Sequence, residues 1–154
     1  GYFVQGLPGV QFALPEAVEQ LRECAAPVTQ DEPIVLLNAC DPANRYGAAG
    51  DGQTAAGETP AFARIPSTSL AMQAGQLILM IAGSGADLTA TAAADAGQLS
   101  RALHTWVAHA GRFEPRLTVA TWNGEPVLGS SGQTLLEAAG FYRDYLAMTW
   151  ERPR

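Results

Sequence analysis

Four polar side chains that could do chemistry follow directly on an apolar run in this sequence. They are Asp41, Asn44, Arg45 and Tyr46, and they surround Pro42. Asp41 can hydrogen-bond the backbone two residues on, and proline fixes its own φ, so we expect a strand to end here. One interpretation is a turn that satisfies its own hydrogen bonds. The other is a nucleic-acid contact by Asn44, Arg45 and Tyr46, with the arginine on phosphate and the tyrosine stacked on a base.

Cations and aromatic residues are interleaved near the C-terminus, a pattern that suits single-stranded nucleic acid. In an alternating strand half of such side chains point into the core, and Arg143 is our candidate contact among them. We expect Arg45 to contribute more than Arg152 or Arg154, because these two lie at a free chain end and must be ordered to bind. The whole set is Tyr142, Arg143, Tyr145, Trp150, Arg152 and Arg154.

Two carboxylates are the best candidates for a general base. Asp41 and Asp144 are the acidic residues best suited to activate a water molecule. Two histidines, His104 and His109, would differ by about 140° around a helix and so do not form one metal site. The sequence also has no CxxC or HExxH motif. We therefore expect no metal site, and the sequence alone assembles no complete catalytic constellation.

The balance of charge limits the functions open to this chain. The net charge is −6; residues 1–100 hold three Arg and ten acidic residues, whereas 101–154 hold six Arg and five. Because nucleic-acid affinity comes largely from phosphate contacts, such contacts are expected in the C-terminal third or in an N-terminal hairpin. The chain has no lysine, which excludes a Walker A phosphate site and a Schiff-base glycosylase-lyase.

Size and composition indicate one main domain without a membrane span. At 154 residues the chain can bury roughly two-thirds of its unfolded surface. It has no run of about eighteen apolar residues. Two cysteines, Cys24 and Cys40, are too few for a disulfide scaffold, so we expect buried thiols in a cytoplasmic protein.

Hydrophobic periodicity predicts an α+β fold with mostly antiparallel strands and about three helices. Closure of the strands into a small barrel would leave no exposed edge, so we expect a barrel-like module. Turns at 83–85 and 123–124 should join hairpins. Helices are expected at 15–25, 96–109 and 130–139, and strands at 34–39, 76–82, 87–91, 116–122, 125–128 and 141–150.

Two short strings resemble the large helicase-related (Lhr) family of superfamily 2 helicases. They read Asp-Pro-Ala-Asn-x-Tyr-Gly at 41–47 and Gly-Glu-Pro-Val-Leu-Gly-Ser at 124–130. Stretches 1–23, 74–83 and 137–141 are similar to the family in the same order, whereas residues 48–72 match it poorly. The resemblance is to the C-terminal region of these helicases.

The resemblance implies a division of the chain. Residues 1–25 would be the wing and last helix of a winged-helix module, and 26–33 would be a linker. Residues 34–154 would form the β-barrel-like module, with a flexible loop at 47–60. Since the sequence begins within the expected wing, we expect it to belong to a longer protein.

The resemblance also implies a role without its own motor. We expect an assembly and nucleic-acid-positioning module of an ATP-dependent DNA repair helicase, with ATP and Mg used elsewhere and no cofactor bound here. Its expected partners are the rest of the helicase chain, a second copy and single-stranded DNA. We expect assembly with other protein modules to be the main role, because the acidic net charge disfavours strong DNA binding and the chain is rich in apolar residues. The alternatives are part of a monofunctional uracil-type glycosylase, or a DNA-binding module in its own right.

Overall fold

The structure is a computed structural model, which describes residues 14–24, 32–44, 46–47, 53–54, 57–58 and 62–153. The expected wing at 2–13, Arg45 and Arg154 lie outside the described residues. The chain divides into two compact units, 1–32 and 33–154. None of the helices in the described ranges has the length and apolar character needed to span a bilayer.

The first unit contains the expected helix, α1 (Pro15–Cys24). Proline at the first helical position and Glu16 in the first turn both favour a helix start there. Val18 is buried, whereas Leu14 and Leu21 are exposed. The expected last residue of this helix, Ala25, lies outside the described residues.

The centre of the second unit is a six-stranded sheet whose strand order is β1-β4-β5-β6-β8-β9. All its neighbours are antiparallel except β6 and β8. Its longest strand is buried over Leu77–Ile81, because apolar side chains cover both faces of the sheet. The strands are β1 (Ile34–Asn38), β4 (Ser69–Gln73), β5 (Gln76–Ala82), β6 (Asp87–Ala90), β8 (Thr121–Trp122) and β9 (Glu125–Pro126). A separate small hairpin pairs β2 (Gln53–Thr54) with β3 (Gly57–Glu58).

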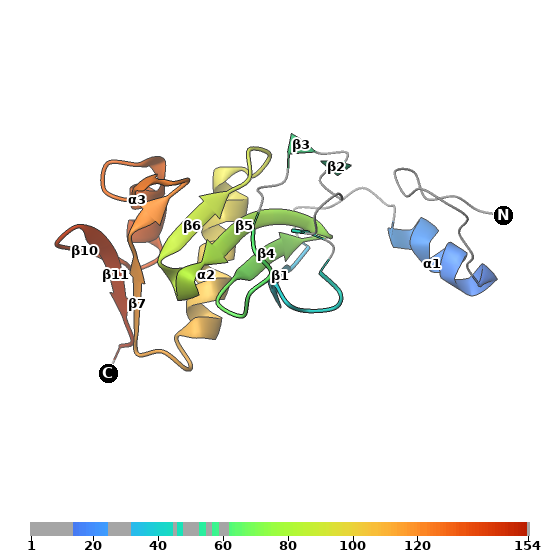
Figure 1. Ribbon diagram of the computed structural model, residues 1–154, viewed down its shortest axis with the longest axis horizontal. Helices are drawn as coiled ribbons and strands as arrows, with labels where there is room; N and C mark the ends of the chain where they lie inside the picture. The colour runs from blue at the N-terminus through green and yellow to red at the C-terminus, as the bar shows by residue number, and fades with distance from the viewer. Residues whose placement is uncertain are drawn as a thin grey trace. The chain divides into compact units, whose positions relative to one another are not determined.

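Two capped helices complete the core. Helix α2 (Ala96–Ala110) starts with a reciprocal capping box between Asp95 and Gln98, and it lies behind the sheet in Figure 1. Helix α3 (Ser131–Ala138) is capped by the Ser130 hydroxyl and packs beside α2. The buried side of α2 and the sheet share one apolar cluster that includes Leu79, Leu88, Leu103 and Trp106.

A second, three-stranded sheet has the order β10-β11-β7. Its strands are β7 (Arg116–Val119), β10 (Tyr142–Asp144) and β11 (Ala147–Glu151), drawn at the left of Figure 1. The expected strand at 116–122 is wrong, because the chain leaves β7 at Ala120 and enters the other sheet as β8. The expected single strand at 141–150 is also wrong. Tyr145 has φ +55°, which turns the chain back into a hairpin.

The α+β class is confirmed, whereas closure into the expected barrel-like module is not found among the described residues. Within the described ranges the strands form open sheets, with β7 and β8 consecutive in sequence but in different sheets. Ala120, the residue between β7 and β8, is held by a hydrogen bond: its amide donates to the Ala86 carbonyl at 2.8 Å. The parallel β6–β8 pairing extends over only two residue pairs, and β9 follows β8 as the last strand of the sheet. A short 3₁₀ turn, η1 (Gly83–Gly85), joins β5 to β6 as expected.

Candidate functional site

The loop after β1 begins with two side chains that bind the backbone. Asn38 Oδ1 accepts from the Cys40 amide, and its Nδ2 donates to the Pro66 carbonyl, both at 2.9 Å. Asp41 Oδ1 accepts from the Ala43 amide at 2.8 Å, which is the turn that its side chain was expected to make. The turn leaves Cys40 exposed, so the expectation of a buried thiol is wrong for this residue.

Asn44 lies inside this loop. Its side chain is only 3% exposed, and both ends of its amide are used. Nδ2 donates to the Ala39 carbonyl and Oδ1 accepts from the Tyr46 amide, each at 2.8 Å. Asn44 therefore shapes the loop from within, and it offers almost no surface to a ligand.

Tyr46 is anchored at both ends of its side chain. Its hydroxyl donates to the Gly75 carbonyl at 2.7 Å, and its ring packs against a buried cluster formed by Leu70, Leu77 and Met80. Sequence reasoning missed Arg64, which closes the loop from outside. Its guanidinium donates to the Tyr46 carbonyl at 3.1 Å and to the Asn44 carbonyl at 2.7 Å. These bonds account for the loop as a turn, and a nucleic-acid role for it stays a prediction.

The β10–β11 hairpin presents the interleaved set differently. Tyr142 is 47% exposed, Tyr145 at the tip is 84% exposed, and Arg143 is exposed between them. Leu146 completes the exposed tip. The partly buried Trp150 lies on the inner side of the sheet with the fully buried Met148; Arg143 pairs with Met148 and shares that side, whereas Tyr142 lies on the outer side. As expected, part of this set of cations and aromatic residues packs inward, whereas Tyr142, Arg143 and Tyr145 remain exposed to solvent and able to contact a ligand.

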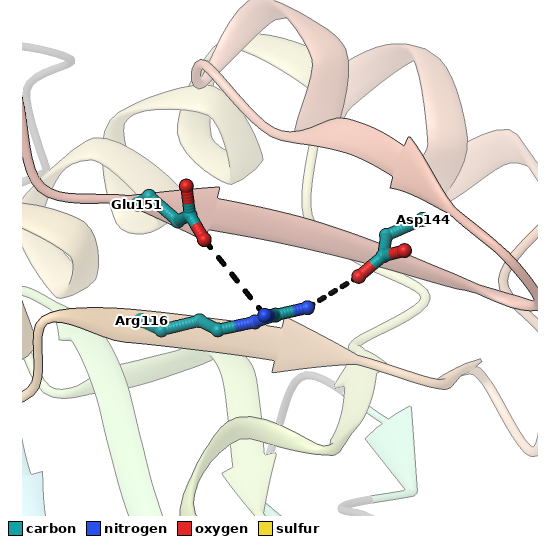
Figure 2. Close-up of polar contacts among 3 residues, drawn as sticks. All are labelled: Arg116, Asp144 and Glu151. Atoms are coloured by element: carbon teal, nitrogen blue, oxygen red, sulfur yellow. Dashed lines mark hydrogen bonds and ion pairs between the residues drawn. The ribbon is translucent and has the colours of Figure 1, made fainter.

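A charged layer covers the outer face of this sheet. Arg116 on β7 forms ion pairs with Asp144 of β10 and with Glu151 of β11, the latter at 3.8 Å (Figure 2). Partial burial raises the pKa of Tyr142 above 10.0, and the negative charge of Glu151 and its hydrogen bond with the phenol raise it further. In the middle strand Thr149 is completely buried, and its hydroxyl has no partner within the described residues. Arg116 thus ties the two edge strands together across β11.

Comparison with known proteins gives the family. A model for the winged-helix domain of large helicase-related proteins matches residues 1–33. A protein of Mycolicibacterium smegmatis (strain ATCC 700084 / mc(2)155), named "Lhr helicase/ probable uracil glycosylase", is 36% identical over 132 residues. The chain carries a region of the Lhr helicase family. The match covers 83% of this chain and 9% of that relative's length.

The two candidate bases of this Lhr region are both engaged. Asp41 completes a backbone turn, and Asp144 is paired with Arg116 on an open sheet face. The ion pair occupies the Asp144 oxygen that would otherwise activate water. Within the described ranges no three His, Cys, Asp or Glu side chains are grouped to hold a metal ion. A catalytic role for either aspartate stays a prediction.

The C-terminal end of the Lhr region is more ordered than expected. The Arg152 amide donates to the Pro115 carbonyl at 2.9 Å, and its Nε donates to the Gly111 carbonyl at 2.7 Å. The premise that Arg152 lies at a free end is therefore wrong. Nothing in the local sequence indicates this anchor, because Gly111 is 41 residues away.

Proposed function

We propose that this region positions single-stranded nucleic acid for an Lhr-type DNA helicase, with the β10–β11 hairpin as a contact surface. The observation that carries the proposal is the exposure of Tyr142, Arg143 and Tyr145 together on one short hairpin. Aromatic faces stack on bases of any sequence, and arginine binds the backbone phosphates. The motor, with its ATP and Mg²⁺, belongs to other parts of the helicase, because this chain has no lysine for a Walker A site.

The hairpin is already held in place before any ligand binds. Ladder hydrogen bonds join β10 to β11, and the Arg116–Asp144 ion pair reaches β10 from the far side of the sheet. Side chains on such a scaffold lose less conformational freedom on binding than side chains of a free chain end. The local charge is also favourable, since residues 101–154 hold more arginines than acids.

The experiment is fluorescence anisotropy with a labelled single-stranded oligonucleotide at low and physiological salt. Tyr145→Ala should weaken binding about 5- to 150-fold, the equivalent of roughly 1–3 kcal/mol for one stacked base. Arg143→Ala should weaken binding and reduce the salt slope by about 0.7, as for one lost phosphate contact. Tyr145→Phe is the matched control, because it keeps the ring and should bind like the wild type. Unchanged affinity in both alanine variants would overturn the proposal.

Assembly through protein contacts is the second candidate function. It is favoured by large apolar side chains on exposed positions, notably Val35 on the edge strand β1 and Leu146 at the hairpin tip. Light scattering on the same samples tests it. A mass above that of the monomer, returning to the monomer in Val35→Lys, would support assembly through β1.

A further inference from the structure

An open cleft of about 670 Å³ lies along the C-terminal half of α2. The described residues that line it include His104, Arg112 and Arg152, and none of them is acidic. A second hollow shares His104 and Arg112 and adds His109. In a protein of net charge −6, this concentration of cationic and ionisable nitrogen groups is the opposite of the average surface.

The helix itself builds the cleft. His104, Ala108 and Arg112 follow one another at intervals of four residues, which places them in one row on the exposed side of α2. The small side chain of Ala108 leaves a hollow between the two larger ones. Gly111 keeps helical dihedral angles, φ −61° and ψ −11°, so the row continues past the last residue of α2.

An aromatic ring lines the same cleft. Trp150 is partly buried, and its indole spans from Gly111 to Gly140. A Cβ on Gly111 would lie 2.6 Å from Trp150 Cη2, and one on Gly140 would lie 3.5 Å from Cδ1. The indole fits here because the residue under its six-membered ring is a glycine. Within the described part of the chain, the indole N–H makes no hydrogen bond, so this donor is available to a ligand.

The two arginines of the cleft are prepared in different ways. Arg152 is oriented by its Nε bond to the Gly111 carbonyl at 2.7 Å, which leaves its terminal nitrogens to bind other groups. The Arg112 side chain has no hydrogen bond or ion pair with any residue that the structure describes. The cleft therefore offers the oriented guanidinium of Arg152 and the unpaired guanidinium of Arg112 beside the Trp150 ring. This combination suits a ligand that has both an anionic group and a flat apolar group.

We infer that this cleft binds a nucleotide, with its phosphate on Arg112 and Arg152 and its base against Trp150. The volume lies within the range of sites for small ligands, roughly 300–1,000 Å³. A free nucleotide and one unit of a single strand share this chemistry. The site lies on α2 and the inner side of β11, so the inference goes beyond the hairpin proposal and does not depend on it.

Tryptophan fluorescence tests the inference directly. Trp106 and Trp122 are 4% and 3% exposed, so quenching by a bound ligand reports mainly on Trp150. The probes are thymidine 5′-monophosphate, an oligothymidylate and inorganic phosphate, each titrated into the intact chain. The mononucleotide and the oligonucleotide should quench saturably, whereas phosphate should compete only weakly.

Two arginine variants separate a built site from general charge. Arg112→Ala should weaken mononucleotide binding about tenfold or more, because it removes one charge-assisted hydrogen bond. Arg101→Ala is the matched control, since it removes the same charge from an exposed position of α2 outside the cleft lining, and it should change binding less than twofold. Tyr145→Ala should leave mononucleotide quenching unchanged, which separates this site from the hairpin.

Each outcome decides a point. Tighter binding of the oligonucleotide than of the mononucleotide identifies a single strand as the ligand, and equal binding identifies a free nucleotide; both support the site. Equal losses in Arg112→Ala and Arg101→Ala would overturn it, as would equal affinities for phosphate and the mononucleotide. Absence of saturable quenching by any probe would overturn it as well.

Discussion

The loop after β1 offers a sharp test of whether its polar residues are structural. Asn44 and Asn38 each make two hydrogen bonds to backbone groups, but Asn44 is 3% exposed and Asn38 is exposed. Asn44→Ala leaves the Ala39 carbonyl and the Tyr46 amide without partners, and Ala39 is completely buried. Each buried unsatisfied group costs about 1–3 kcal/mol, so the two together should lower the free energy of unfolding by about 2–6 kcal/mol.

Asn38→Ala is the matched control for this substitution. Water can replace its side chain at the exposed groups, so we expect a loss of only about 1 kcal/mol. Urea denaturation followed by circular dichroism gives both values, provided that the slopes agree with that of the wild type. Oligonucleotide affinity should be unchanged in Asn44→Ala under conditions where it is folded. Equal destabilisation by the two variants, or a binding defect in a fully stable Asn44→Ala, would refute the structural account of this loop.

Three further predictions concern the packing of Gly132, the ionisation of Tyr142 and the hydrogen bonds of Arg64 to the loop after β1. Gly132→Ala should destabilise the protein by about 1–3 kcal/mol in thermal melts, because its Cβ would overlap the buried Trp122 ring. Glu151→Gln should lower the pKa of Tyr142 toward 10.0 in an absorbance titration at alkaline pH. Because folding raises the pKa of Tyr142, the neutral phenol stabilises the folded protein at pH values below 10.0. This stability is lost as the pH rises through the pKa of Tyr142 in the folded protein. The wild type should therefore lose more stability over that pH range than Glu151→Gln. Arg64→Ala should speed amide exchange of Tyr46 while leaving strand β5 protected, since it removes two bonds to the loop only.

Elements with a strong local signal were predictable from the sequence. The apolar run at 76–82 is β5 to the residue, and the capped helix α2 starts where its Asp95 cap predicts. Asn123 and Gly124 both have positive φ, as their two-residue hairpin turn requires. In these places the backbone preference and the burial of the side chains agree.

Elements that depend on their partners were not predictable. Strand β4 reads Ser-Leu-Ala-Met-Gln, which has no β-branched or aromatic residue, and pairing with β1 and β5 gives it its conformation. In the turn from β4 to β5, Ala74 has φ +46°, a conformation that is not predicted for alanine from sequence. The hairpin at Tyr145 escaped prediction for the same reason.

The same distinction separates the parts of the candidate sites. The Asp41 turn joins residues two apart, so local chemistry predicts it. Arg64 reaches the loop from 18 and 20 residues away, and no local pattern marks it. Residues that lie together only after folding therefore had to come from the structure.

The α2 cleft combines residues that spacing alone does not bring together. His104 and His109 were judged from their spacing not to form one metal site, and in the structure both line the second hollow together with Arg112. Arg152 joins the first hollow because its bond to Gly111 holds it there. A chain with an acidic average can thus hold a basic surface built from segments about forty residues apart. For the proposed nucleic-acid contact, the local charge at such a surface decides binding, because screening limits electrostatic attraction to roughly 10 Å.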